Sequence, residues 1–113
     1  MHEVSIILSI VDRAAEVVQQ NHGKAVGKIE LEIGELAGIE WTSFDFAWEP
    51  AVRDSVLSKA KRVVHRIPGI AVCSRCEKEF QKVNLFDPCP ECGEYLHHLK
   101  SGKELRIRSI TIT

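Results

Sequence analysis

The chain has 113 residues, enough for one compact domain that carries a small metal-stabilised module. Its apolar fraction of 44% and charged fraction of 27% are typical of a globular protein. Fifteen basic and sixteen acidic residues give a formal net charge of -1, which argues against nucleic acid or a membrane surface as a partner. The longest apolar run, residues 4–11, is too short to span a bilayer and lacks a basic flank, so we expect a cytoplasmic protein.

Two segments show the spacing of amphipathic helices. Apolar residues recur at helical intervals over residues 4–21, and Gly23 is expected to cap this helix in the left-handed conformation. Thr42 or Ser43 is expected to cap the start of a second helix. Pro50 lies inside that second pattern and implies a kink or an early end.

The period-two alternation of strands appears in residues 28–33, 62–67 and 105–112. The last of these changes phase near Arg108 and Ser109, where a β-bulge would restore the inward face. We therefore expect an α+β fold, a small antiparallel sheet with two helices on one face. This first domain comprises residues 1–69 and is completed by the last strand within residues 101–113, so the segment between them is an insertion.

The inserted segment, residues 70–100, contains two Cys-x-x-Cys motifs separated by twelve residues: Cys73, Cys76, Cys89 and Cys92. Two such motifs at this spacing predict a structural zinc ribbon, because four thiolates fill a tetrahedral shell. A redox dithiol is an alternative, but it needs only one motif. A one-iron electron carrier is another, although Glu77 follows the first motif where rubredoxins place glycine.

The charge of this segment bears on nucleic-acid binding, which many zinc ribbons perform. Residues 70–100 hold four basic and five acidic side chains. A zinc ion bound by four thiolates adds about two further negative charges. A ribbon of this sign repels phosphate, so a protein-contact role is favoured and a nucleic-acid ribbon is only a third alternative.

The amino terminus carries a second candidate metal site. The Met1 amine, the His2 amide nitrogen and the His2 imidazole can close a five-membered and a six-membered chelate ring around one ion. Such a nitrogen set suits square-planar Ni²⁺ or Cu²⁺, and Glu3 offers a further amide or a carboxylate. Acidification is expected to release the ion, because protons compete for the same lone pairs. A solvated histidine at a frayed chain end is the alternative.

Over its full length the chain resembles the HypA/HybF family of hydrogenase nickel-insertion proteins. The resemblance rests on the opening Met-His-Glu-Val-Ser, on Glu-Ile-Gly-Glu-Leu at residues 32–36, on the paired cysteine motifs and on residues 104–110. It implies a nickel metallochaperone, with an amino-terminal nickel site and a structural zinc site, and no enzyme. It also places a nearby acidic ligand or supporting group at Glu40.

The resemblance further implies partners, a HypB-type GTPase and the precursor of the [NiFe]-hydrogenase large subunit, with urease as a possible further client. The chain itself is expected to be a monomer or a weak homodimer. A zinc-ribbon adaptor without a nickel function is the alternative, and it should tolerate loss of His2. His97 and His98 are considered as further nickel ligands, although neighbouring strand residues point to opposite faces.

Overall fold

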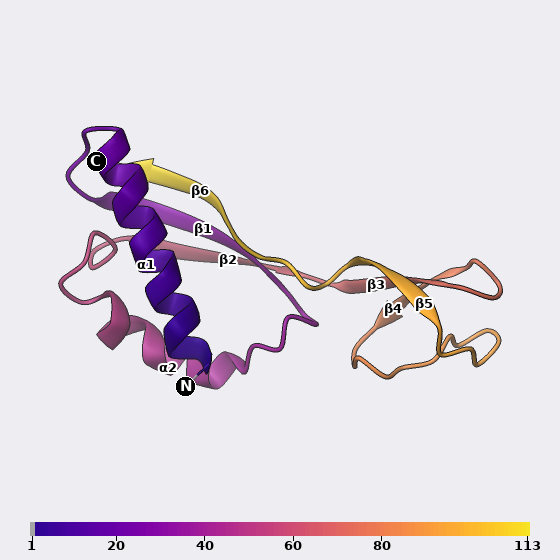
Figure 1. The fold of residues 1–113 in the computed structure, drawn as a ribbon. Coiled ribbons are helices and arrows are strands. Elements are labelled where there is room, and N and C mark those ends of the chain that lie inside the picture. The colour runs from indigo at the N-terminus through magenta and orange to yellow at the C-terminus, as the bar shows by residue number, and fades with distance from the viewer. Residues whose placement is uncertain (1) are drawn as a thin grey trace. The chain divides into compact units, whose positions relative to one another are not determined.

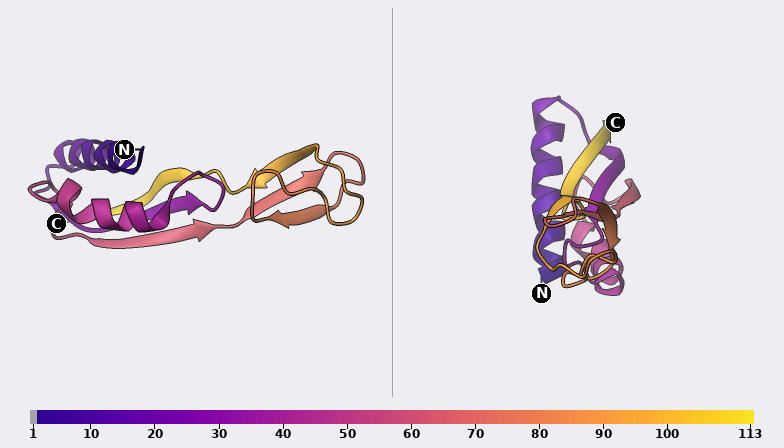
Figure 2. Two further views of the ribbon diagram at one scale, coloured as in Figure 1. Left: turned by 90° about the horizontal axis from the view of Figure 1, so that it is seen from below. Right: turned by 90° about the vertical axis from the view of Figure 1, so that its right-hand side faces the viewer.

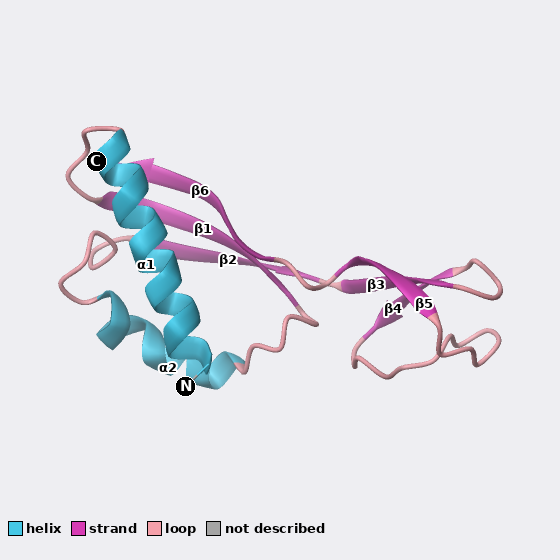
Figure 3. Ribbon diagram, viewed as in Figure 1, coloured by secondary structure: helices cyan, strands magenta, loops and turns pink. Residues whose placement is uncertain are grey.

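The computed structural model describes residues 2–113, and the chain folds into α-helices and β-strands in an α+β arrangement (Figures 1 and 3). The elements are α1 (His2–Gln20), β1 (Val26–Gly34), α2 (Trp41–Val52), β2 (Lys61–Ile67), β3 (Gly69–Cys73), β4 (Glu79–Lys82), β5 (His97–Ser101) and β6 (Leu105–Ile112). The predicted class, with two helices, small sheets and an inserted cysteine module, is confirmed.

Helix α1 buries one apolar stripe, with Ile7, Ala14 and Val18 almost fully inaccessible. This spacing of seven and four residues places all three side chains on the same face of the helix. The predicted helix is therefore confirmed, and it begins two residues earlier than the apolar pattern indicated.

The cap at the end of α1 differs from the prediction. His22, not Gly23, has the positive φ, at 55°, and the Gly23 N–H donates to the Val18 carbonyl at 2.9 Å. Glycine is required at position 23 for a different reason: a Cβ there would lie 2.1 Å from a side-chain carbon of Ile112. A histidine tolerates the left-handed conformation better than most side chains do, so it can occupy the cap.

Helix α2 begins one residue before the predicted cap, because Glu40 is the N-cap residue. Its carboxylate accepts hydrogen bonds from the N–H groups of Thr42 and Ser43 at 3.3 and 2.6 Å. Thr42 and Ser43 are therefore capped by Glu40 and are not capping residues themselves. Pro50 lies inside the helix, which ends two residues later. The buried ring of Phe44 anchors α2.

Strands β2, β1 and β6 form one three-stranded sheet, in that order. Figure 2 shows α1 lying across one face of this sheet, and α2 packs against α1. On β1 the alternating residues Ile29, Leu31 and Ile33 are buried, while the glutamates between them are half-exposed. On β6 the half-buried positions change from odd to even along the strand, as a bulge would require, and the bulge itself stays a prediction.

The inserted segment forms a second sheet of three antiparallel strands in the order β4-β3-β5. Register shifts between Ile70 and Ala71, where β3 pairs with β5. The small core beneath this sheet contains Ala71, Cys73, Phe80 and Cys89. With a core this small, the segment depends on something other than apolar burial for stability.

The residues divide into two compact units. The first comprises the described residues through Leu31, together with Ile39–Val64 and Ile107–Thr113. The second comprises Glu32–Gly38 and His65–Arg106. Strands β1, β2 and β6 each contribute residues to both units, and the domain boundaries given by the sequence stay a prediction.

Two glycines, Gly34 and Gly102, allow two segments of the second unit to approach each other closely. The Leu36 N–H donates to the Gly102 carbonyl at 2.7 Å, and a Cβ on Gly34 would lie 2.0 Å from that same carbonyl oxygen. Gly102 itself has a φ of 119°, which L-residues rarely adopt. Larger residues at these two positions would separate the segments on either side of the cysteine module.

Candidate metal centres

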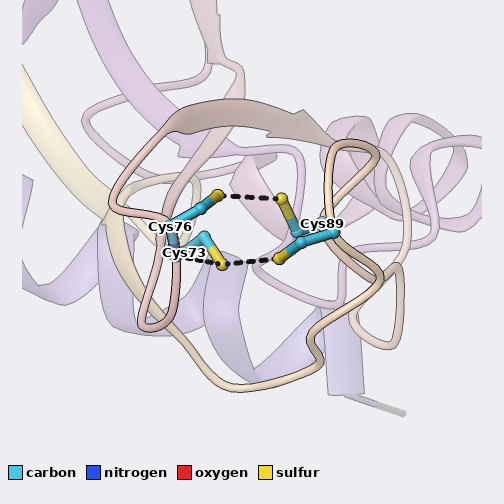
Figure 4. A group of neighbouring side chains, drawn as sticks. Cys73, Cys76 and Cys89 are labelled. Atoms are coloured by element: carbon cyan, nitrogen blue, oxygen red, sulfur yellow. Dashed lines mark hydrogen bonds between the residues drawn. The ribbon is translucent and has the colours of Figure 1, made fainter.

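The four cysteines converge on one point in the second unit (Figure 4). Their Sγ atoms all lie within 4.8 Å of one another, with 3.6 Å between Cys73 and Cys92 and 3.6 Å between Cys76 and Cys89. Four sulfurs placed tetrahedrally around zinc, each about 2.3 Å from the ion, lie about 3.8 Å apart. A disulfide would need about 2.05 Å, so the cysteines are free and their arrangement fits a closed tetrathiolate shell.

Both cysteine motifs have the same backbone hydrogen bonds. In the first, the Glu77 N–H donates to the Cys73 carbonyl at 3.0 Å, and the Cys73 N–H donates to the Lys78 carbonyl at 3.0 Å. The second motif repeats both bonds at the equivalent positions, at 2.8 and 2.9 Å. Glu77 and Gly93 are equivalent, with φ angles of 62° and 76°. Each turn therefore presents two sulfurs on one side, and Glu77 adopts a conformation that suits glycine.

The electrostatics of the four sulfurs also favour a bound cation. The Cys76 and Arg75 N–H groups each donate to the Cys73 sulfur at 3.4 Å, and these bonds lower the pKa of Cys73 to about 6. At Cys92 the Glu94 N–H favours the thiolate, but partial desolvation of the sulfur and the neighbouring thiols together prevail and raise its pKa to about 12. Four adjacent sulfurs cannot all ionise without a positive charge among them, and a divalent metal supplies that charge.

The amino-terminal candidate lies where α1 begins. Met1, predicted as a ligand, lies outside the described residues. His2 is exposed and Glu3 is half-buried, both in the first turn of α1. The first four N–H groups of a helix have no intrahelical acceptor, so a metal that binds the His2 amide nitrogen removes no helical hydrogen bond. The Ser5 hydroxyl donates to the His2 carbonyl at 2.9 Å and fixes this turn.

Glu40 brings the start of α2 to the start of α1. Its backbone N–H points to the Glu3 carboxylate at 3.4 Å, although the two residues are 37 positions apart in the sequence. Hydrogen bonds from the hydroxyl and N–H of Ser43 hold the pKa of Glu40 below its usual value. Two of the predicted site residues, Glu3 and Glu40, therefore lie side by side, with the Glu40 carboxylate used as a helix cap.

Among the described residues, His2, His97 and His98 do not form a set of three metal-binding side chains with Glu3 and Glu40. Within residues 2–113, the cysteines form the one set of three or more metal-binding side chains close enough to share an ion. His97 Nδ1 lies 2.9 Å from the Tyr95 carbonyl, which can only accept, so Nδ1 donates this hydrogen bond. The His97 ring contacts Phe80 edge-on, whereas His98 is exposed.

Sequence reasoning missed one residue that organises the second unit. Lys82 is only 1% exposed, and its ammonium donates to the carbonyls of Leu85 and Asp87 at 2.7 and 3.0 Å. The period-two spacing from Phe80 places Lys82 on the inner face of β4, a signal that was available in the sequence. A lysine at an inward position predicts an internal acceptor, here supplied by a loop.

Neither helix in the described part of the chain is long and apolar enough to cross a membrane.

Comparison with known proteins gives a consistent result. A family model described as hydrogenase/urease nickel incorporation, metallochaperone, hypA matches residues 1–112. Relatives named hydrogenase maturation factor HypA include a protein of Parabacteroides distasonis, 45% identical over 99% of this chain and 97% of the relative. Another, from Geobacter metallireducens, is 39% identical over 99% of both. The solution structure of the Ni metallochaperone HypA from Helicobacter pylori aligns with a TM-score of 0.68 over 97% of this chain and 96% of that one, and at 20% identity it shows a shared fold.

Proposed function

Because this chain belongs to the HypA family of hydrogenase and urease nickel-incorporation metallochaperones, we propose that it carries Ni²⁺ at its amino terminus, on Met1, His2 and Glu3. As a member of this family it is a nickel-carrying maturation factor and not an enzyme. The observation that carries the proposal is the family match over residues 1–112, which includes these amino-terminal residues.

The local geometry supports this nickel site. An amine, a deprotonated amide and an imidazole are strong nitrogen donors that suit a square-planar d8 ion. His2 and Glu3 lie in the first helical turn, where amide nitrogens are not used by the helix. Glu40 serves as a supporting residue, because its N–H directs the Glu3 carboxylate while its own carboxylate holds α2 in place.

The zinc site is proposed to consist of Cys73, Cys76, Cys89 and Cys92. Their sulfur spacing leaves no open coordination position, so the ion has a structural role and supplies the stability that the small core lacks. Nickel is then cargo and zinc is a resident part of the fold. The two metals bind donor sets of different chemistry, nitrogen for nickel and sulfur for zinc, which keeps them apart.

The partners of this chain are proposed to be a HypB-type GTPase, which exchanges nickel with it, and the precursor of the [NiFe]-hydrogenase large subunit, which receives the nickel. Urease is proposed as a further client. The place of action is proposed to be the cytoplasm. Support for these partners comes from the family, whose members serve hydrogenase maturation.

The test of the nickel site is a calorimetric Ni²⁺ titration of zinc-loaded protein and of its His2→Ala variant. Loss of the imidazole removes one chelate ring, so the variant is expected to bind nickel at least about a hundredfold more weakly, or not at all. The His98→Ala variant tests the alternative ligand, because His98 is also an exposed histidine, and it is expected to bind nickel as the unmodified chain does. Equal nickel binding by His2→Ala and the unmodified chain would show that the site lies elsewhere.

A further inference from the structure

The four cysteines of the second unit differ in their exposure to solvent. Cys92 is exposed, whereas Cys76 is half-buried and the other two are buried. The thiolate, and not the thiol, is both the form that binds a metal and the form that reacts with oxidants. Susceptibility of a cysteine to oxidation follows its thiolate character and its exposure. Among the four proposed zinc ligands, Cys92 is therefore the one that combines both properties.

A second cysteine lies within reach of this exposed sulfur. The Sγ atoms of Cys73 and Cys92 are 3.6 Å apart, and the two residues belong to different motifs. The Cys73 sulfur accepts hydrogen bonds from the N–H groups of Arg75 and Cys76, both at 3.4 Å, and such bonds stabilise a thiolate. Because a disulfide has an S–S distance of about 2.05 Å, an approach of about 1.5 Å would join this pair.

The charge around Cys92 determines which oxidants can approach it. Glu91 precedes Cys92 and Glu94 follows two positions later, and only Glu91 has a lysine nearby, the Lys78 ammonium at 3.4 Å. Residues 70–100 carry one more acidic than basic side chain, and four thiolates around zinc add about two negative charges. Anionic oxidants such as glutathione disulfide are repelled by this charge, whereas uncharged hydrogen peroxide is not.

We propose that Cys92 is an oxidation site for hydrogen peroxide and that Cys73 completes the reaction by forming a disulfide with it. The Cys92 thiolate attacks one peroxide oxygen, the O–O bond breaks, and Cys92 becomes a sulfenic acid as hydroxide leaves. The Cys73 thiolate then attacks the Cys92 sulfur, and a second hydroxide leaves as the S–S bond forms. Two protons from solvent convert both hydroxides to water, so the two thiolates lose two electrons and one peroxide gains them.

This reaction changes the capacity of the second unit to hold zinc. A disulfide sulfur is no longer a thiolate ligand, so two of the four ligands are lost at once. Cys76 and Cys89 alone bind zinc far more weakly than four thiolates do, and the ion is released. Zinc occupancy of the second unit thus depends on peroxide. This inference rests on the zinc site of the proposed function and does not involve the nickel site.

The first experiment treats zinc-loaded, nickel-free protein with an equimolar amount of hydrogen peroxide and locates the disulfide by mass spectrometry after the remaining thiols are alkylated. Trypsin cleaves after Arg75 and a glutamate-specific protease cleaves after Glu91, so each cysteine lies in a peptide of its own. The expected product joins the peptides of Cys73 and Cys92. A colorimetric zinc indicator should show zinc release in proportion to this product.

The second experiment compares two variants, Cys92→His and Cys89→His, each checked for bound zinc before peroxide is added. Both keep four ligands, because a histidine nitrogen can replace a thiolate around zinc, but only the first removes the exposed sulfur. Under excess peroxide, Cys92→His is expected to release zinc at least about tenfold more slowly than Cys89→His. If either variant binds no zinc, the disulfide found in the unmodified chain decides alone.

A first disulfide between any other two cysteines would overturn the proposal, and so would equal rates of zinc release in the two variants. Retention of zinc by the unmodified chain under excess peroxide would overturn it as well. Absence of zinc from the untreated protein would refute the zinc site of the proposed function, and the inference with it. Failure of the oxidation site alone is therefore distinguishable from failure of the zinc site.

Discussion

Phe44, Ile7 and Ile29 are among the largest fully buried side chains of the first compact unit, whereas those of the second are Ile33, Lys82, Cys73 and Cys89. Burial of hydrocarbon contributes about 25 cal/mol per Å², and this can hold a helix on a sheet without help. A buried ammonium and two thiols contribute little of this kind. The first unit is therefore stable through its apolar core, and the second depends on a metal ion and internal hydrogen bonds.

The largest expected effect in a test of this comparison is the unfolding that follows zinc removal. Chelation, or the Cys73→Ser substitution, should unfold the second unit, because structural zinc sites contribute roughly 10 kcal/mol or more. Amide NMR signals of residues 70–100 should lose dispersion, while those of α1 and α2 keep theirs. Restored dispersion on adding zinc back is the control for chelation. Loss of structure in both units at the same chelator concentration would contradict the comparison.

The reverse experiment is the Phe44→Ala substitution in the first unit. Phe44 is fully buried and contacts the rings of Trp41 and Trp48, so truncation should cost about 3–5 kcal/mol. Urea unfolding followed by circular dichroism should show the loss, while a colorimetric assay finds zinc still bound.

Phe46→Ala is the control for this substitution, because Phe46 lies on the same helix and is 83% exposed. Its cost should stay within about 0.5 kcal/mol. Release of zinc at the same urea concentration that melts the Phe44→Ala helices would mean that the two units unfold as one.

A smaller effect is expected at Glu77, which has a φ of 62° in the first cysteine turn. The Glu77→Gly substitution should stabilise the second unit by up to about 1 kcal/mol, because glycine adopts this conformation without strain. In competition with a chelator, the variant should lose zinc more slowly, or only at a higher chelator concentration. Gly93→Ala changes the equivalent residue of the second turn in the opposite sense and should destabilise. Equal effects of one sign in both variants would refute the explanation.

The smallest effect is a pH dependence at the cap of α2. The pKa of Glu40 is lowered below 4.5 in the folded chain by hydrogen bonds from Ser43, so its contribution to stability is present at higher pH and is lost as pH falls through that lowered value. The melting temperature of Glu40→Gln should lie below that of the unmodified chain at pH 7. This difference should shrink as pH falls below about 4.5. A constant difference from pH 7 to 3 would assign the effect to something other than this carboxylate.

How far the sequence predicts the structure depends on whether a feature is local. The strand at residues 28–33 and the four cysteines were predictable, because alternation and motif spacing are written in consecutive residues. The cap at Glu40 was missed, because hydroxyl residues follow it and the usual preference favours them. Gly23 was predicted to be a left-handed cap, but what requires glycine there is its contact with Ile112. Ile112 is 89 residues away in the sequence, so no local pattern indicates this contact.

The candidate sites show the same limit. The Glu3–Glu40 contact joins residues 37 positions apart, and only the fold brings the two helix starts together. The resemblance pointed to Glu40 but could not show that its carboxylate caps a helix. The burial of Lys82 depends on the loop that follows it, whose carbonyl directions cannot be read from residue types.

Nickel is proposed to bind a chelate that begins at the amino terminus. The decisive experiment is a calorimetric Ni²⁺ titration of the zinc-loaded chain beside the same chain with one glycine added before Met1. The extension moves the amine and leaves every side chain intact. The unmodified chain is expected to bind one nickel, and the extended chain is expected to show a large loss of affinity. Equal binding by both chains would contradict it.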